Sequence, residues 1–480
     1  MPTTRHGIQP ERPTRLPYRG RRDGRLRESE DKVSARSGNG FAMPDIFTRK
    51  SESARWYRAL GLGGMISLSR LALSFISIKF TAIYLGPSGL ALVAQLANFM
   101  SICHSMIGNS LGSATSRLYP EFRNDHARRK RFLATSWRLA SIFAVASIVA
   151  IALGSGPLAR WLLTSDEHRA AVMLGGIAVV CMVFNSVIIS AINGAGEMGR
   201  VVASGMIAAV AGILVYVPAS VMWGIPGGLI GYAISQTVCL PVSLIFLRGS
   251  SSLAPGDFHG EFDNAEARRI LGFAPMLLVH ATMSPLGLIL IRDMVASHLG
   301  LETAGLWQAT WRLSEVYLGL VMASLSLYFL QRLGEVVGTP ALSGEIVRTF
   351  ARAVGSTAII ALTIFLLRDQ IVQIVFTEKF LPVRDLMPYQ LLGDVLRMSA
   401  WTLGFVFVAL VRSRWYIALE ILIPAIYFGG ALLLVPRFGV QGVTWAYCLA
   451  GAAHFAISAF ALRDVLFQGS DGRSVVSKRD

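Results

Sequence analysis

Charged residues are scarce in this chain. They make up 15% of its 480 residues, whereas hydrophobic residues make up 53%. In a soluble domain about a quarter of the residues are charged. Apolar runs recur from Leu60 to Leu462, and many reach the length of about 20 residues with which a helix crosses a bilayer core. The scarcity of charge excludes an ordinary soluble domain and predicts a polytopic, all-α membrane protein.

Signatures of disulfide, metal and nucleotide sites are missing as well. The chain has 4 cysteines, and none of them forms a C-x-x-C pair, which argues against a disulfide framework and a zinc site. No lysine follows a glycine, so the G-x-x-x-x-G-K-[ST] phosphate loop is absent, and H-E-x-x-H is absent too. We expect no cofactor, no metal and no ATP hydrolysis, so that any transport uses a gradient or equilibrates its substrate.

Acidic residues are outnumbered by basic ones, which gives a net charge of +16. Residues 1–53 form a basic segment without apolar periodicity, which predicts a disordered tail, and Met43 offers an alternative start of translation. Between the apolar runs, Arg and Lys concentrate in every second connection, on the side that also holds both ends of the chain. The positive-inside rule therefore predicts both termini in the cytoplasm. Because topology accounts for the basic charge, no nucleic-acid partner is expected.

Apolar runs separated by charge, Gly or Pro predict twelve transmembrane helices. Two pairs of loop motifs also repeat at a nearly constant offset. YLG at 84–86 resembles HLG at 298–300, and WGIPGGLIGY at 223–232 resembles FGVQGVTWAY at 438–447. The repeat predicts two pseudo-symmetric six-helix bundles of the same orientation, with the substrate bound between them near the midplane. The expected spans are 59–84, 89–116, 131–154, 170–193, 201–222, 226–247, 269–291, 303–330, 346–367, 386–410, 416–435 and 440–462. The expected domains are a tail at 1–53, a first bundle at 54–248, a cytoplasmic linker at 249–268, a second bundle at 269–465 and a tail at 466–480.

Polar residues inside span 303–330 mark a candidate site, because a charge at the bilayer centre costs about 2.5–3.5 kcal/mol on insertion scales. Gln308, Arg312 and Glu315 follow one another at i, i+4 and i+7, which places them on one face of a helix. Trp311 flanks this stripe, while Trp307 is expected to anchor the helix at the membrane interface.

A second stripe occupies one face of span 386–410. It consists of Gln390, Asp394, Arg397 and Trp401. Both stripes start near the predicted periplasmic end and run inward, so we expect them to face the same cavity. The oppositely charged residues three apart within each stripe are alternatively ion pairs that only tie helices together.

The first half supplies further polar residues at membrane depth. Arg70 lies near the middle of span 59–84, and Lys79 lies nearer its periplasmic end, from which it alternatively snorkels to the surface. Gln95 and Asn98 lie in span 89–116. Four acidic residues are candidates for proton or cation coupling or for ion pairs, namely Asp293, Glu315, Asp394 and Glu420.

These side chains suit a ligand that carries both phosphate and sugar. Arginine and lysine bind phosphate or diphosphate, while amides and indole faces suit sugar hydroxyls and rings. A lipid-linked phosphosugar has both parts and leaves its tail in the bilayer. We expect the two arginines of the stripes, with one of the two cations in span 59–84, to attract the diphosphate. The residues expected to bind the substrate are Arg70, Lys79, Gln95, Asn98, Gln308, Trp311, Arg312 and Arg397.

Three stretches resemble the Wzx-type polysaccharide flippases of the MOP superfamily, in particular the branch for O-antigen units and the enterobacterial common antigen intermediate. They are KFTAIYLGPSGLALVAQLANF, GLWQATWRLSEVYLG and LLGDVLRMSAWTLGFVFVA. The resemblance, which runs from about Ala54 to Leu466, implies a MATE-like fold in the bacterial cytoplasmic membrane. It implies flipping of an undecaprenyl-diphosphate-linked oligosaccharide to the periplasmic leaflet, with a polysaccharide polymerase and a chain-length regulator as partners. By matching position it also implies a cavity lined by Lys79, Gln95, Asn98, Trp311, Arg312, Asp394 and Arg397.

Two other functions stay open. A cation-coupled multidrug antiporter of the same superfamily places an acidic residue in the first helix of a half; here that helix carries Arg70 and Lys79, although Asp293 meets the requirement in the second half. A membrane glycan polymerase or ligase usually needs a large periplasmic loop, and every predicted outside loop in this chain is short.

Overall fold

The structure is a computed structural model that describes residues 73–122, 125–272 and 274–466. Arg70, Met43, the predicted tail 1–53 and residues 467–480 lie outside the described residues. Within them every regular element is an α-helix or a short 3-10 turn. This confirms the predicted all-α fold.

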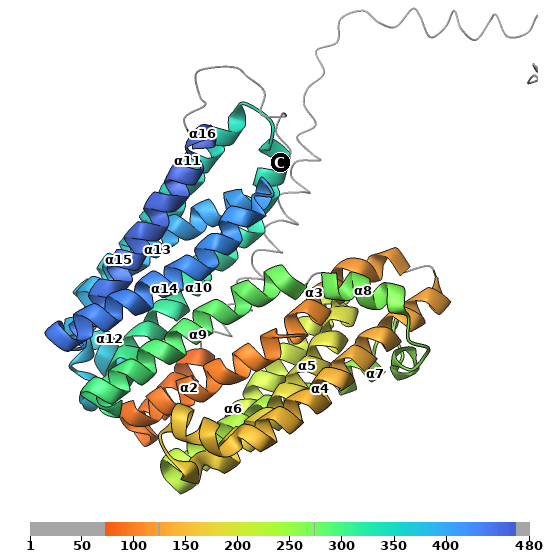
Figure 1. Ribbon diagram of the computed structural model, residues 1–480, viewed down its shortest axis with the longest axis horizontal. Coiled ribbons are helices and arrows are strands. Elements are labelled where there is room, and N and C mark those ends of the chain that lie inside the picture. The colour runs from red at the N-terminus through yellow and green to blue at the C-terminus, as the bar shows by residue number, and fades with distance from the viewer. Residues whose placement is uncertain (1–72, 123–124, 273, 467–480) are drawn as a thin grey trace, which may run out of the picture. The chain divides into compact units, whose positions relative to one another are not determined.

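Two groups of helices follow one another along the chain (Figure 1). The first half consists of helix Leu73–Tyr84, α2 (Gly86–Ser105), α3 (Gly108–Leu118), α4 (His126–Leu163), α5 (Arg169–Gly194), α6 (Met198–Thr237), α7 (Cys239–Arg248) and α8 (Asn264–Gly272). The second half consists of α9 (Ala274–Leu299), α10 (Leu301–Val336), α11 (Ala341–Leu366), α12 (Arg368–Val375), α13 (Val383–Ala409), α14 (Ser413–Phe438), α15 (Gln441–Ala461) and α16 (Arg463–Leu466). Among the described residues, 9 helices are long and apolar enough to cross a membrane, so the chain is a multi-pass membrane protein.

Some predicted spans differ from the helices in the structure. Span 89–116 is divided into α2 and α3, because Ile107 leaves helical geometry with φ −136° and ψ −32°. The predicted boundary between spans 201–222 and 226–247 coincides with non-helical Gly224 inside α6, whereas span 226–247 is itself divided between α6 and α7.

Most buried apolar residues of each half form one cluster, and the second cluster also includes Ile78, Ala82 and Leu90 of the first half. Phe122 and Phe132 are fully buried in the first core, and Phe329 and Phe407 are buried in the second. Because lipid tails are as apolar as these rings, close van der Waals packing and not removal from water holds them together within the bilayer. The packing of each half on itself keeps its helices in place around the cavities described below.

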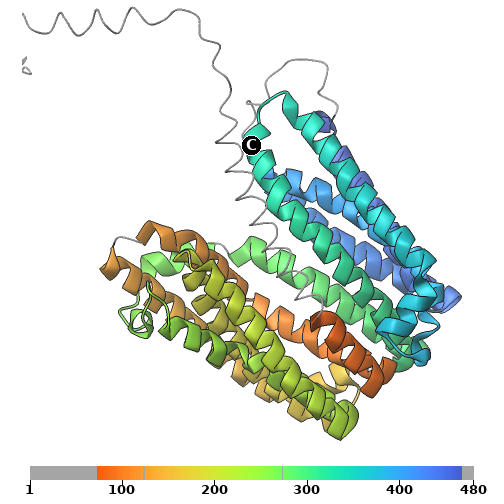
Figure 2. The same cartoon turned by 180° about the vertical axis from the view of Figure 1, so that it is seen from behind.

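Helix α2 packs against both halves. It contacts α5 of the first half and also α9 and α10 of the second half, and α2 lies beside α9 in both views (Figures 1 and 2). Ala91 of α2 is fully buried in a cluster whose other members belong to the second half, among them Ala304 and Trp307. Helix α2 is therefore one of the elements through which the two halves meet.

Candidate functional site

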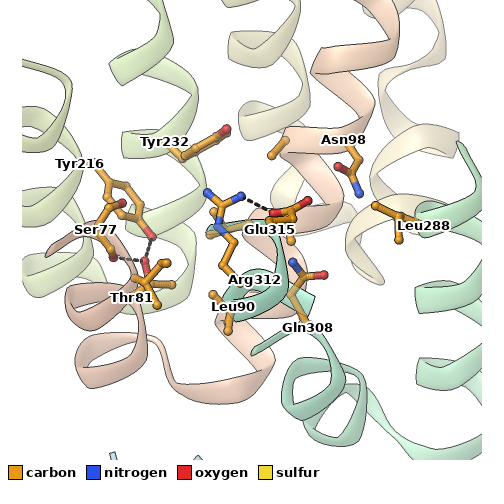
Figure 3. A pocket seen from close by; sticks show the side chains of 14 residues that line it. Ser77, Thr81, Leu90, Asn98, Tyr216, Tyr232, Leu288, Gln308, Arg312 and Glu315 are labelled. Atoms are coloured by element: carbon orange, nitrogen blue, oxygen red, sulfur yellow. Dashed lines mark hydrogen bonds and ion pairs between the residues drawn. The ribbon is translucent and has the colours of Figure 1, made fainter. Parts of the chain in front are cut away.

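A cavity lies where helix Leu73–Tyr84, α2 and α6 face α9 and α10 (Figure 3). We call it the first cavity. It encloses about 550 Å³, its open mouth included. Its polar lining consists of Ser77, Thr81, Asn98, Tyr216, Tyr232, Gln308, Arg312 and Glu315.

Arg312 is the cation of the first cavity. Its Nη1 donates to Oε2 of Glu315 at 2.9 Å, one helical turn further along α10. The two side chains are 46% and 40% exposed, which shows that they reach into open space. Figure 3 shows the Arg312 guanidinium between Tyr232 and Gln308. Because a solvent-exposed ion pair contributes only about 0–1 kcal/mol, an anionic ligand can compete with Glu315 for Arg312.

The opposite wall of the first cavity carries hydroxyl and amide groups. Thr81 Oγ1 and Tyr216 Oη are 2.8 Å apart and join helix Leu73–Tyr84 to α6. Asn98 of α2 is half-buried and turns its amide into the cavity (Figure 3). Such groups donate to phosphate oxygens, and they both donate to and accept from sugar hydroxyls.

Two predicted binding residues, Gln95 and Gln308, are engaged by an arginine that the sequence did not single out. Arg292 of α9 donates to Oε1 of Gln95 at 2.5 Å and to Oε1 of Gln308 at 2.5 Å. Gln95 is 3% exposed and also donates to the carbonyl of Ile289 at 3.3 Å. Gln308 is 3% exposed but still contributes to the lining of the first cavity. Gln95 thus joins α2 to α9, while Gln308 both lines the first cavity and bonds to Arg292.

The predicted second stripe faces a different space. The second cavity lies inside the second half between α9, α10, α13, α14 and α15 and encloses about 640 Å³ with its mouth. Four aromatic and three ionisable side chains line it, namely Trp311, Trp401, Tyr427, Tyr447, Arg397, Glu420 and His454. The expectation that both stripes face one cavity was therefore wrong. Steps of three and four residues place side chains on one face of each helix, but they do not determine which neighbours those faces meet.

Arg397 is enclosed by aromatic rings. Its guanidinium carbon lies 4.2 Å from the ring centroid of Trp401, 4.9 Å from that of Trp311 and 5.8 Å from that of Tyr447. Its Nη1 donates to Tyr447 Oη at 3.4 Å. Cation–π contacts of this kind contribute about 0.5–2 kcal/mol each.

Asp394 belongs to a buried hydroxyl cluster. Its Oδ2 accepts from Ser314 Oγ at 2.6 Å and from Tyr317 Oη at 2.6 Å, and its Oδ1 accepts from Tyr447 Oη at 2.8 Å. The carboxylate is fully buried. These bonds join α10, α13 and α15, and they replace the i,i+3 ion pair with Arg397 that was considered from the sequence. A coupling role for Asp394 stays a prediction.

Glu315 connects the two cavities. Besides pairing with Arg312, it accepts from Nε1 of Trp311 at 2.9 Å. Trp311 lines the second cavity and Arg312 lines the first. One carboxylate therefore bonds to a lining residue of each cavity.

The remaining predicted residues lie apart from the first cavity. Lys79 Nζ donates to the main-chain carbonyls of Phe376 at 2.5 Å and Gln373 at 3.2 Å, in the second half. Asp293 is half-buried and bonds to the indole of Trp161. Glu420 lines the second cavity.

Trp307 differs from its expected place at the membrane interface. It is fully buried and lies under the guanidinium of Arg292, whose central carbon is 5.7 Å from the ring centroid. Arg292 itself was visible in the sequence as a charge in an apolar run. Tyr216 and Tyr232, by contrast, carried no signal, because tyrosines at that depth look like ordinary packing residues.

The comparisons with known proteins concern nearly the whole chain. No protein-family model matches it. The Lipid III flippase of Escherichia coli (strain K12) is 23% identical over 396 residues, which cover 82% of this chain and 94% of that protein.

Solved structures share the fold. An inward-facing multidrug resistance MATE family transporter of the MOP superfamily aligns with a TM-score of 0.68 and 17% identity, over 85% of this chain and 96% of that one. The Lipid II flippase MurJ in an inward closed conformation aligns with a TM-score of 0.68 and 12% identity, over 83% of this chain and 87% of that one. These likenesses confirm the predicted MOP/MATE-like fold.

Proposed function

We propose that this chain is a flippase that moves an undecaprenyl-diphosphate-linked oligosaccharide from the cytoplasmic to the periplasmic leaflet of a bacterial cytoplasmic membrane. The proposal is supported by the sequence likeness to a Lipid III flippase over 94% of that protein's length. We infer a role in the synthesis of a cell-surface polysaccharide, whether O-antigen, common antigen or exopolysaccharide. The proposed process moves the lipid without changing its covalent structure, so the chain is a translocase and not an enzyme.

The observation that carries the proposal is the exposed Arg312 in a membrane-embedded cavity bordered by both halves. A cation kept at that depth calls for an anionic partner. Glu315 meets this need only in part, because the pair is open to solvent. A diphosphate brings more negative charge and several acceptor oxygens, which suits a guanidinium.

The sugar part suits the neutral groups around the arginine. Asn98 and Gln308 carry amides, and Tyr216 and Tyr232 carry phenolic rings, all at the same cavity. Rings and amides side by side serve both the apolar face and the hydroxyls of a sugar. The polyprenyl tail needs no site of its own in this proposal, since it stays in the bilayer while the head group crosses.

Reconstituted transport tests the proposal directly. Proteoliposomes that contain a fluorescent undecaprenyl-diphosphate-linked sugar report flipping as the fraction of fluorophore that becomes accessible to an impermeant quencher. We expect flipping by the parent chain, a loss of roughly tenfold or more in Arg312→Ala, and partial activity in Arg312→Lys, which keeps the charge but loses the bidentate geometry. No flipping by the folded parent chain would refute the proposal.

The same proteoliposomes distinguish the proposed flippase from a cation-coupled multidrug antiporter. Its fold is shared by a MATE family transporter, and Asp293 supplies a half-buried acid. Uptake of a cationic dye that is lost in Asp293→Asn, without flipping of the lipid, would favour the antiporter. Coupling to protons or another cation is tested by collapsing the gradient during flipping.

A further inference from the structure

Arg292 is a buried cation that forms no ion pair with a carboxylate of the described residues. It is 2% exposed. Its Nη1 bonds to Gln95, and its Nη2 and Nε bond to Gln308 at 2.5 and 3.2 Å. Both acceptors are neutral amide oxygens, and among the described residues no carboxylate lies within 4.0 Å of the guanidinium. A buried charge is costly unless it is paired, so any anionic oxygen that comes within reach competes well for Arg292.

The bond to Gln95 crosses between the halves. Gln95 belongs to α2 of the first half, and Arg292 and Gln308 belong to α9 and α10 of the second half. One turn before Gln95, Ala91 is fully buried among second-half residues. The cluster therefore holds the seam between α2 and the second half closed.

The bond to Gln308 leads to the first cavity. Gln308 lines that cavity one turn before Arg312, and Leu288, one turn before Arg292, lines it as well. An anion held by Arg312 and Gln308 therefore lies next to the acceptor that restrains Arg292. Since an anionic oxygen also neutralises the buried charge, which the amide of Gln95 does not, the anion is a better partner for Arg292 than Gln95 is.

We propose that Arg292 is a substrate-operated latch. Bound to Gln95 and Gln308 it keeps the seam between α2 and the second half closed, and a diphosphate that binds beside Gln308 and Arg312 draws it away and frees α2. The identity of the anion rests on the proposed function, whereas the latch itself does not. In this mechanism the ligand favours one conformation because it offers Arg292 a partner that only the open seam allows.

The latch is tested without any ligand. In a variant whose four cysteines are replaced by serine or alanine, Ala91→Cys reports opening of the seam through its rate of labelling by a maleimide in lipid nanodiscs. Gln95→Leu removes one charged hydrogen bond and is expected to raise this rate about tenfold or more. Gln95→Glu offers a carboxylate and is expected to lower the rate below that of the parent.

A buried amide elsewhere provides the matched control. Gln390 is 1% exposed and donates to Ser314 Oγ at 3.2 Å, within the second half. Gln390→Leu is expected to leave the labelling rate within about twofold of the parent. An unchanged rate in Gln95→Leu, or an equal rise in Gln390→Leu, would overturn the latch. A cooperative thermal transition in each variant shows that the labelled protein is folded.

Operation by substrate is tested with undecaprenyl diphosphate, with undecaprenol as the neutral control. Undecaprenyl diphosphate is expected to raise the labelling rate about fivefold or more in the parent. In Gln95→Glu it is expected to leave the labelling rate unchanged. Undecaprenol is expected to leave the labelling rate of the parent unchanged. Binding is measured separately with radiolabelled undecaprenyl diphosphate. Binding without faster labelling would overturn operation by substrate, whereas absence of binding would overturn the proposed function and leave the ligand-free result to decide the latch.

Discussion

Gly224 and Gly439 have the same backbone conformation, with φ +59° and ψ −140° in the first and φ +61° and ψ −149° in the second. They are the equivalent glycines of WGIPGGLIGY and FGVQGVTWAY. Residues with a Cβ are nearly excluded from this region. The repeat seen in the sequence therefore extends to the backbone, and each glycine lets one helix end and the next begin without an intervening loop.

The first prediction concerns these turns. Gly439→Ala is expected to lower the free energy of unfolding by about 1–3 kcal/mol, because alanine is strained in this conformation. The thermal unfolding midpoint of the protein in detergent measures it. Gly404→Ala is the matched control, since Gly404 lies within α13 and a Cβ there meets nothing within 4 Å. Equal midpoints for Gly439→Ala and the parent would contradict the prediction.

The second prediction concerns Asp394. Asp394→Asn turns one acceptor oxygen into a donor, so at least one of the three hydroxyl bonds is lost and the protein is destabilised by about 1.5–3 kcal/mol. Asp385→Asn at the exposed start of α13 is the control and is expected to change little. Unfolding midpoints of the two variants check this. Unchanged stability in Asp394→Asn, together with loss of flipping, would instead assign Asp394 to coupling.

The third prediction concerns Lys79. Lys79→Met loses the bonds to the carbonyls of Gln373 and Phe376, and we expect the unfolding midpoint to fall. Binding of undecaprenyl diphosphate is expected to stay within about twofold of the parent, since the change lies away from the first cavity. The exposed Lys379 serves as control in Lys379→Met. Weaker binding with unchanged stability would restore Lys79 to the substrate site predicted from the sequence.

The fourth prediction concerns pH. The Arg412 guanidinium bonds to Asp464 and holds the pKa of that carboxyl below its ordinary value. The stabilisation is therefore complete above that ordinary value of about 3.9 and is lost as the pH falls below it. Both side chains are partly exposed, at 26% and 45%, so the effect is small. The difference in unfolding midpoint between the parent and Asp464→Asn is expected to shrink between pH 6 and pH 3, and a difference that grows would contradict this.

The candidate site was only partly predictable. Arg312 and Glu315 were expected on one face of a helix, and they do lie together at a cavity. Their pairing follows from helical geometry alone, because residues three and four apart are neighbours. Arg397 was predicted on the polar face of its helix, and it does line a cavity. That cavity is the second and not the first, since the surrounding side chains include residues of α14 and α15.

The predicted domain boundaries stay predictions, although the backbone of the repeated glycines agrees with two related halves.

The presence of the helices was predictable because each span carries its own apolar signal. The break at Gly224 falls between two predicted spans, whereas the break at Ile107 was not predicted, because a break within an apolar run leaves the hydropathy unchanged.

By itself the sequence determined that this is an all-α membrane protein with an internal repeat, because hydropathy and turn glycines act locally along the chain. Only the tertiary structure decided which polar groups share a cavity, that Gln95 and Gln308 serve Arg292, and that Trp307 is buried and not at the interface. The physical reason is that a helix face is set by its own residues, whereas a charge inside a membrane takes the partner that the packing of distant helices brings to it.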